Sequence, residues 1–344
     1  MEETNVIQSE NITADAKKHF SRIGLRLFFG VIIMHAVSIG TALLCAKIWP
    51  QITENTTLAL VVSYIPMLFV GYPAMYLLLK PLPAVAPGNG KLGAKWFFMF
   101  FLMTYGCMVV ANLIGTLVGV IIEQVFPGTV ASTNDVQGIL MEGNMFVTFL
   151  FAVVCAPILE ELIFRKLLVD RTLVYGEGVA IVFSGLVFGL FHGNLTQFVY
   201  AFVIGVLFAL VYARTGKIYI TICLHMILNF IGGILGVLLI RKLGAEDLFN
   251  SLGDMDDLEL MAQALQTHGR SLLIFALYAL VLYAMVFAGI ILLIVNRKAL
   301  TPRPGRLQIP KGQRFMTVIG NLGMVLFLVL MIFVIVSEMV GLNI

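Results

Sequence analysis

Long apolar stretches recur along this chain of 344 residues, and polar segments separate them. A helix rises about 1.5 Å per residue, so roughly 20 apolar residues are needed to cross a hydrocarbon core of about 30 Å. Nine stretches serve as candidate spans: 24–46, 58–79, 95–122, 145–164, 178–193, 197–213, 218–240, 271–295 and 315–340. The fifth and sixth are short and joined through GNLT. The pattern predicts an all-α, polytopic transmembrane helix bundle of eight to nine spans.

The composition agrees with this prediction and excludes several classes of protein. Hydrophobic residues make up 60% of the chain and charged residues 12%, whereas soluble domains hold about 45–50% and about 25%. The apolar composition implies the lipid bilayer as a partner, and with a net charge of only +3 we expect no nucleic acid. None of the four cysteines has CxxC spacing, which indicates neither a disulfide framework nor a cysteine zinc site.

Charged residues between the candidate spans orient the chain. Lysines and arginines gather in alternate loops, for example at 80–95, 165–171, 214–217 and 297–314. The loops between them are acidic or neutral, with Asp135 in one and a run from Glu246 to Glu259 in another. Because cytoplasmic loops carry the excess of Lys and Arg, we expect a cytoplasmic N-terminus and, with nine spans, an external C-terminus.

Two adjacent glutamates and an arginine interrupt the apolar stretch APILEELIFRKLL, residues 156–168. A charge in a membrane-buried helix costs about 2.5–3.5 kcal/mol on insertion scales. Glu161 and Arg165 are four positions apart and can pair on one helix face. Glu160 points about 100° away, beyond the local reach of Arg165. We therefore expect one supporting acid, Glu161, and one working acid, Glu160. Pro157 is expected to kink the helix just before them.

Two further polar patterns lie in the following spans. FGLFH ends in His192, and HMILN runs from His225 to Asn229. His225 and Asn229 share a helix face, so both can point to one place. A hairpin near residues 176–178 gives Glu160 and His192 comparable depth. A rise of about 1.5 Å per residue puts His225 about 13 Å into the membrane. We expect the two histidines and Glu160 to meet in a cavity that opens toward the cytoplasm.

Each of these patterns has an ordinary structural explanation when taken alone. Paired glutamates at a helix end often form an interfacial charge cluster, and an HxxxN pair can hydrogen-bond between helices. Together, on spans adjacent in sequence, they favour a function, because ionisable residues inside a membrane are costly. They supply what hydrolysis needs: a carboxylate that takes a proton from water, a histidine that orients it, and donors to an oxyanion.

The stretches APILEELIFR, FGLFH and HMILN resemble the EExxxR, FxxxH and HxxxN motifs of the CAAX-protease and bacteriocin-processing family of intramembrane endopeptidases. The resemblance covers residues 145–240 and implies a hydrolase in a bacterial plasma membrane. The substrate it implies is a membrane-associated peptide or a prenylated CaaX-type tail, cleaved near the cytoplasmic face. The catalytic residues that the resemblance implies are Glu160, His192, His225 and Asn229. Glu161 and Arg165 would support them.

The motifs divide the chain into four parts. We expect a cytoplasmic tail at 1–23, accessory spans at 24–144, a catalytic core at 145–240, and an acidic loop with further spans at 241–344.

The same residues also have the chemical types of a catalytic zinc site. Such a site takes three His or carboxylate ligands, here Glu160, His192 and His225, and family members are often labelled metalloproteases. However, the chain has no HExxH, and the three candidates come from three different spans. Asn229 is better suited to donate a hydrogen bond to an oxyanion than to bind a metal ion. We therefore favour a mechanism without a cofactor, with Zn²⁺ as the alternative.

Two other functions would use the same polar cluster. A non-proteolytic membrane scaffold or bacteriocin-immunity protein would bind a partner through it. A secondary transporter would use Glu160 and the histidines as a proton relay, and inverted repeats would accompany that function. The sequence shows no such repeat.

Overall fold

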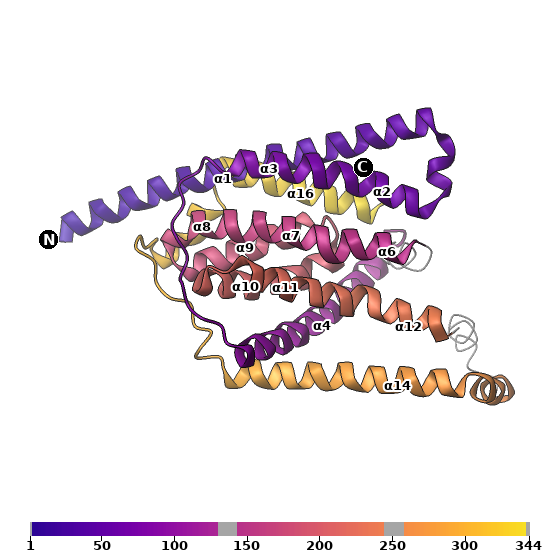
Figure 1. Ribbon diagram of the computed structural model, residues 1–344. Helices are drawn as coiled ribbons and strands as arrows, with labels where there is room; N and C mark the ends of the chain where they lie inside the picture. Colours follow the sequence, from indigo (N-terminus) through magenta and orange to yellow (C-terminus); the bar gives the residue numbers. More distant parts are fainter. Residues whose placement is uncertain (1, 130–142, 244–257, 342–344) are drawn as a thin grey trace.

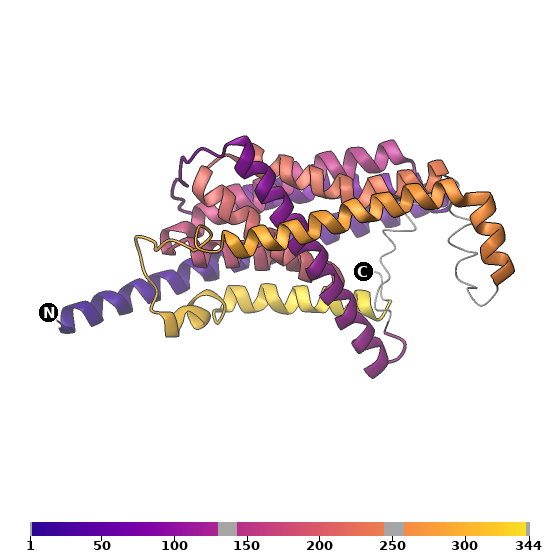
Figure 2. The ribbon, with the colours of Figure 1, turned by 90° about the horizontal axis from the view of Figure 1, so that it is seen from below.

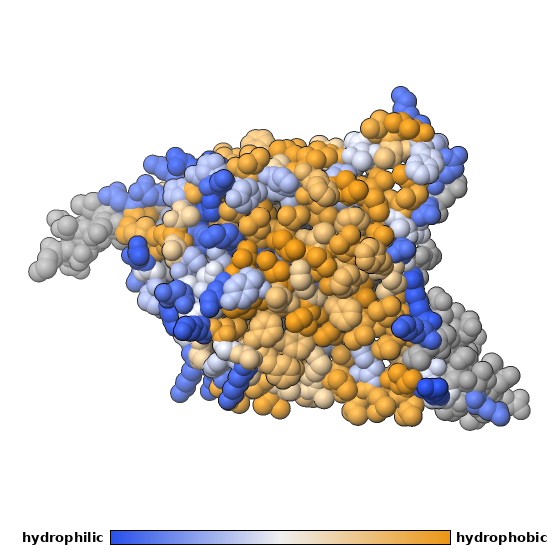
Figure 3. Space-filling view, in the orientation of Figure 1, coloured by the Kyte–Doolittle hydropathy of each residue, from blue (hydrophilic) through white to orange (hydrophobic). Residues whose placement is uncertain are grey.

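The computed structural model describes residues 2–129, 143–243 and 258–341. They form a bundle of helices, most of which run along a common direction (Figures 1 and 2). Figure 3 shows apolar side chains in a broad band across the middle of the bundle and polar ones at its two ends. Eight helical segments of the described chain are long and apolar enough to cross a membrane. The predicted all-α polytopic fold is confirmed.

The first three spans match the first three candidates in position, although α1 begins far earlier than expected. Residues 2–23, predicted as a tail, are the N-terminal part of this helix. The elements of this part are α1 (Glu2–Ile48), η1 (Pro50–Glu54), α2 (Thr56–Pro66), η2 (Met67–Gly71), α3 (Tyr72–Leu79) and α4 (Ala94–Val125). Of these, η1 is a 3₁₀-helix and η2 is a π-helix.

The motif-bearing segment is broken into many short helical pieces. Three of them, η3, η4 and η6, are π-helices, and η5 is a 3₁₀-helix. In chain order the elements are α6 (Met145–Thr148), η3 (Phe149–Cys155), α7 (Ala156–Glu161), η4 (Leu162–Val169), α8 (Asp170–Thr172), η5 (Leu173–Tyr175), α9 (Glu177–Phe191), α10 (Leu195–Thr215), α11 (Ile218–Asn229), η6 (Phe230–Leu235) and α12 (Gly236–Leu243). The last part holds α14 (Leu258–Val295), the 3₁₀-helix η7 (Lys311–Gln313), α15 (Arg314–Val318) and α16 (Leu322–Met339).

The fifth candidate span is the short helix α9, which has 15 residues. At about 1.5 Å per residue it reaches about 22 Å, less than the roughly 30 Å of a hydrocarbon core. It turns at residues 192–194 and packs antiparallel against α10. Gly185 and Gly205 face each other in this pair, and a Cβ on either would collide with the opposite backbone. The close approach is therefore possible only for glycine, as in small-residue interfaces of membrane helices.

The motif-bearing helices lie in a middle layer of the bundle. In Figure 1, α1, α3 and α16 cover one side of this layer, and α4 and α14 cover the other. The covering helices also pack on one another, α1 against α16 and α3, and α14 against α4. Arg171 ties the layers together, because its Nε donates to the Leu79 carbonyl at 2.8 Å and its Nη2 to the Lys80 carbonyl at 2.7 Å. The Leu79 carbonyl also accepts from the Leu82 N–H at 3.1 Å, so Arg171 adds a second donor there at the end of α3.

The basic loops lie at one end of the bundle. The loops 80–93 and 296–313 are at the left in Figure 1, where the N-terminus also lies, whereas the C-terminus is toward the other end. The acidic stretches expected around Asp135 and from Glu246 to Asp257 lie outside the described residues. A cytoplasmic N-terminus stays a prediction that rests on the basic loops.

We expect Gln51 and Lys298 on opposite sides of the membrane. Both are exposed, and they lie at opposite ends of the bundle, Gln51 in η1 and Lys298 after α14. With the four native cysteines replaced by alanine, Gln51→Cys should react with a membrane-impermeant maleimide in intact cells. Lys298→Cys should react only after permeabilisation. The reverse labelling pattern would mean that the basic loops face outward.

Candidate active site

The first motif lies on α7, between two π-helical segments. In η3 the register is five residues, since the Ala156 N–H donates to the Phe151 carbonyl. The next acceptor in this register is the Ala152 carbonyl, but the residue that would serve it is Pro157, which has no N–H. The Asn229 amide takes that place, with Nδ2 2.9 Å from the Ala152 oxygen. The distortion expected at Pro157 is thus present as π-helical turns, which are frequent at functional sites.

Glu161 and Arg165 form the ion pair that their spacing predicts. Arg165 Nε lies 3.0 Å from Glu161 Oε2, and neither side chain is exposed. The guanidinium also lies over the ring of Phe188 at 4.4 Å and near that of Phe208 at 5.5 Å. Desolvated contacts of this kind contribute about 2 kcal/mol. The pair therefore anchors the first motif to Phe188 of the second motif and to α10.

His225 contacts both glutamates of the first motif. Its Nδ1 lies 3.0 Å from Glu161 Oε1, and its Nε2 lies 3.6 Å from Glu160 Oε2. Because ionised Glu161 only accepts hydrogen bonds, Nδ1 of His225 is the donor. In the neutral ring, Nε2 then carries the lone pair, and in the imidazolium it carries a proton. Glu161 thus sets which ring nitrogen of His225 faces Glu160.

Glu160 has a partner that the sequence did not reveal. The Tyr72 hydroxyl, on the first residue of α3, donates to Glu160 Oε1 at 3.1 Å. Tyr72 is 2% exposed, whereas the Glu160 side chain keeps 15% exposure. Tyr72 is one of three tyrosines in its span, and tyrosines in apolar spans are usually interpreted as packing or interface residues, so only its contact reveals this role. The less buried acid is the one that faces His225 Nε2.

His192 joins the group through aromatic packing. Its ring lies edge-on to Phe188, at 4.9 Å between centroids, and Phe188 in turn lies edge-on to His225 at 5.7 Å. Its Nδ1 contacts the Phe188 carbonyl at 2.9 Å, which leaves Nε2 available. Within the described residues His192 makes no hydrogen bond to Glu160 or His225, although it interacts electrostatically with both.

A residue outside the three motifs holds the turn after His192. Asn194 Nδ2 donates to Glu338 Oε1 of α16 at 2.8 Å, and the Asn194 side-chain oxygen accepts from the Gln197 N–H at 3.0 Å. The C-terminal helix thereby holds the turn that carries His192.

The zinc alternative can be compared with this geometry. In the part of the chain that the structure describes, no three His, Cys, Asp or Glu side chains are grouped as ligands of one metal ion. The Nδ1 contacts of His225 with Glu161 and of His192 with a backbone carbonyl leave both Nε2 atoms available, and such contacts also accompany metal-ligating histidines, so they do not decide between the mechanisms. As placed, Glu160, His192 and His225 do not form a ligand set, so we assign no step to a metal.

Comparison with known proteins shows that the motif-bearing segment is similar to a family of endopeptidases. Residues 142–231 match the family model described as type II CAAX prenyl endopeptidase Rce1-like. This segment contains all four candidate catalytic residues, and the resemblance inferred from the three motifs is confirmed for it.

Two bacterial relatives are similar over part of their length. The chain is 24% identical to the membrane-embedded CAAX protease MroQ of Staphylococcus aureus (strain USA300) over 142 residues, 39% of this chain and 56% of that protein. It is 35% identical to the putative membrane peptidase YdiL of Bacillus subtilis (strain 168) over 80 residues, 22% of this chain and 32% of that protein. The matches thus cover about half of the first relative and a third of the second. No solved structure matches.

The two glutamates should differ in their effect on stability. Glu161→Gln leaves the buried Arg165 without a counter-charge, which costs about 3–5 kcal/mol. We expect a clear drop in melting temperature and yield of the detergent-solubilised protein. Glu160→Gln, at the more exposed acid, should melt close to the wild type. Equal destabilisation by the two substitutions would contradict the division into a supporting and a working acid.

Asn229 and Pro157 should be energetically coupled. Asn229→Ala leaves the Ala152 carbonyl without a donor, and an unsatisfied buried polar group costs about 1–3 kcal/mol. In a Pro157→Ala background the new backbone N–H can serve this part of the helix, so Asn229→Ala should cost less. Thermal unfolding of the single and double variants gives the coupling energy.

The control for this cycle is Cys223→Ala, because Cys223 is exposed on the same helix as Asn229. It should not couple to Pro157. An equal cost of Asn229→Ala in both backgrounds would contradict the assigned backbone role.

Proposed function

Because residues 142–231 carry the type II CAAX prenyl endopeptidase Rce1-like segment, we propose that the chain is an intramembrane endopeptidase that uses an activated water. The observation that carries the proposal is the approach of His225 Nε2 to Glu160 Oε2, at 3.6 Å, within a buried group. A carboxylate in such a group can take a proton from a bound water, and the imidazole beside it can donate to the oxyanion that forms.

The reaction follows from these positions. Glu160 takes one proton as the water oxygen adds to the carbonyl carbon of the scissile peptide bond, and the carbonyl electrons move onto its oxygen. When the carbon–nitrogen bond breaks, its electron pair stays on nitrogen, and Glu160 returns the proton to that nitrogen. The Tyr72 hydroxyl orients Glu160 through the 3.1 Å hydrogen bond, so that one carboxylate oxygen is fixed and the other faces the water.

The other motif residues would orient the water and bind the oxyanion. His192, whose Nε2 is available, is assigned to the water together with Glu160. His225 and Asn229 are assigned to the oxyanion; His225 can donate from Nε2 only as the imidazolium. The Asn229 amide has two N–H groups, one of which serves the Ala152 carbonyl, so one remains for substrate.

The proposed substrate is a membrane-associated peptide or a prenylated CaaX-type tail, and its cleavage site would lie near the cytoplasmic face. Glu160 lies inside the span Met145–Tyr175, so a substrate has to enter between the helices. A lipidated or apolar peptide can do this at low cost, because burying each apolar CH₂ contributes about 0.8 kcal/mol.

A non-catalytic scaffold or immunity protein is the second candidate function. The polar contacts also stabilise helix packing, which is what such a protein would need. The 15% exposure of Glu160, beside the fully buried Glu161, favours a working group over a packing group. A metal-independent reaction is part of our proposal, with Zn²⁺ as the competing possibility.

The decisive measurement is hydrolysis by the purified full chain in lipid nanodiscs of a panel of fluorogenic membrane and prenylated CaaX peptides. Glu160→Gln should abolish cleavage while the protein remains folded. Tyr72→Phe keeps the ring and removes only the donor, so kcat should fall about tenfold with KM unchanged. Tyr76→Phe, one turn further on α3, is the matched control and should keep wild-type kinetics.

A chelator arm distinguishes the two mechanisms. Activity should survive exhaustive treatment with phenanthroline, with elemental analysis of the same sample. Loss of activity that stoichiometric zinc restores would sink the metal-independent mechanism. Cleavage that persists in Glu160→Gln would leave the scaffold as the better explanation of the polar cluster.

A further inference from the structure

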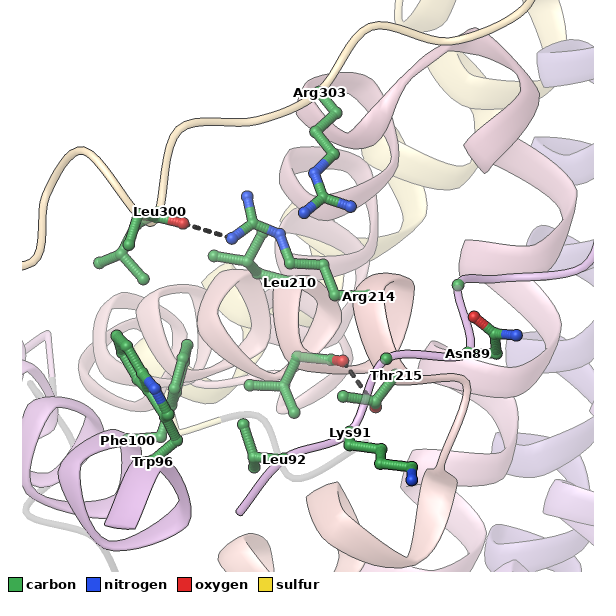
Figure 4. Close-up of a pocket in the computed structure, with 14 residues that line it drawn as sticks. Asn89, Lys91, Leu92, Trp96, Phe100, Leu210, Arg214, Thr215, Leu300 and Arg303 are labelled. Carbon is green, nitrogen blue, oxygen red and sulfur yellow. Dashed lines mark hydrogen bonds between the residues drawn. The ribbon is translucent and has the colours of Figure 1, made fainter.

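A cavity lies at the end of the bundle that carries the basic loops, away from the motif residues. Its volume is about 450 Å³, and it is bounded by the start of α4, the end of α10, and the segments 88–92 and 299–303 (Figure 4). The three charged residues that line it are all basic: Lys91, Arg214 and Arg303.

One of these three cations is already used by the fold. Arg214 pairs with Glu177 at 3.1 Å, and it also donates to the backbone carbonyls of Ala299 and Thr301. It fastens the segment after α14 to the end of α10 and so shapes the cavity. Its charge is largely neutralised, and we do not assign it to a ligand.

The other two cations are available. Arg303 has a side chain that is 71% exposed, with Nε 4.0 Å from Glu177 Oε1, a long and weak pairing. Lys91 is exposed, and among the described residues its ammonium group has no acceptor. The cavity therefore presents two positive charges that a negatively charged ligand could neutralise.

The floor of the cavity is held by backbone contacts. The N–H groups of Gly88 and Gly90 donate to the carbonyls of Ala213 and Arg214, at 2.7 and 3.0 Å. A Cβ at either glycine would crowd the Arg214 carbonyl, so the loop approaches α10 as closely as it can. Lys91 follows directly on this fixed segment, which limits the freedom of its backbone before any ligand binds.

One wall of the cavity is apolar and aromatic. It consists of four large side chains from α4, α10 and the segment after α14: Trp96, Phe100, Leu210 and Leu300. Trp96 is 37% exposed at the start of the span Ala94–Val125. Tryptophan is enriched at the depth of lipid headgroups, where its ring contacts both acyl chains and water.

From this combination we infer that the cavity binds the headgroup of an anionic phospholipid, such as phosphatidylglycerol. Arg303 and Lys91 come from opposite sides of the cavity (Figure 4), and we expect their exposed side chains to reach the headgroup from either side while the first acyl carbons lie against Trp96 and the apolar wall. Basic pockets between membrane helices at the cytoplasmic side recognise such headgroups, and that leaflet is the anionic one. A free phosphate would satisfy the cations but leave the apolar wall unused. The inference does not depend on the proposed peptidase activity.

The test is thermal unfolding of the purified full chain in a neutral detergent, with added phosphatidylglycerol, phosphatidylcholine or inorganic phosphate. Phosphatidylglycerol should raise the melting temperature in a saturable way, and the other two should not. In the double variant Lys91→Gln, Arg303→Gln, the concentration for half-maximal stabilisation should rise roughly tenfold. Trp96→Ala should weaken the lipid effect while leaving both cations in place.

The matched control is the double variant Arg297→Gln, Lys311→Gln. It removes the same two charges from exposed positions at the same end of the molecule, outside the cavity. It should respond to phosphatidylglycerol like the wild type. Equal weakening in both double variants would reduce the effect to diffuse surface charge and overturn the site. A response to inorganic phosphate equal to that to the lipid would overturn the lipid assignment, as would no lipid response in the wild type.

Discussion

The buried ion pair of Glu161 and Arg165 is the interaction on which the rest of the site depends. Two charges with no exposed surface are tolerated in a membrane only if they neutralise each other, since the desolvation cost is several kcal/mol per ion. Glu161 Oε2 lies 3.0 Å from Arg165 Nε, and Glu161 Oε1 accepts a hydrogen bond from Nδ1 of His225. The contact that neutralises the arginine therefore also orients the imidazole. Because the guanidinium lies on the ring of Phe188, the same pair positions the helix that ends at His192.

Local spacing predicted the ion pair within one helix, and depth along the spans predicted that His225 comes near Glu160, but other contacts between helices were not predicted. The i, i+4 relation of Glu161 and Arg165 is fixed by helical geometry, so the sequence was sufficient. The Tyr72 contact joins residues 88 positions apart, and the sequence does not distinguish Tyr72 from Tyr64 and Tyr76 in the same span. Asn229 shares a face with His225 as predicted, yet its amide serves the Ala152 carbonyl. That acceptor becomes unpaired only in a π-helical register beside Pro157, which a pattern of 3.6 residues per turn does not represent.

The sequence predicted eight to nine spans because contacts between helices also decide whether α9 crosses the membrane. A length rule assumes that each helix crosses the hydrocarbon alone, whereas α9 is buried among protein neighbours and ends before a full crossing. Irregular backbone is tolerated at such depth only where its polar groups are satisfied. Here the N–H groups of His192 and Gly193 donate to the Gly189 and Leu190 carbonyls, and Asn194 caps the next helix. Gly193 supplies the positive φ, +65°, that the tight turn needs.

The helices outside the matched segment are therefore part of the site's chemistry and not only its support. Residues 142–231 contain Glu160 and both histidines, but the donor to Glu160 comes from α3 and the carboxylate that holds Asn194 comes from α16. A carboxylate inside a membrane takes its reactivity from the few polar groups that reach it, because water does not dominate its surroundings. Two proteins with the same three motifs and different flanking helices would place different groups beside this carboxylate. In the proposed mechanism the motifs thus supply the reacting groups, whereas the flanking helices determine the environment of Glu160.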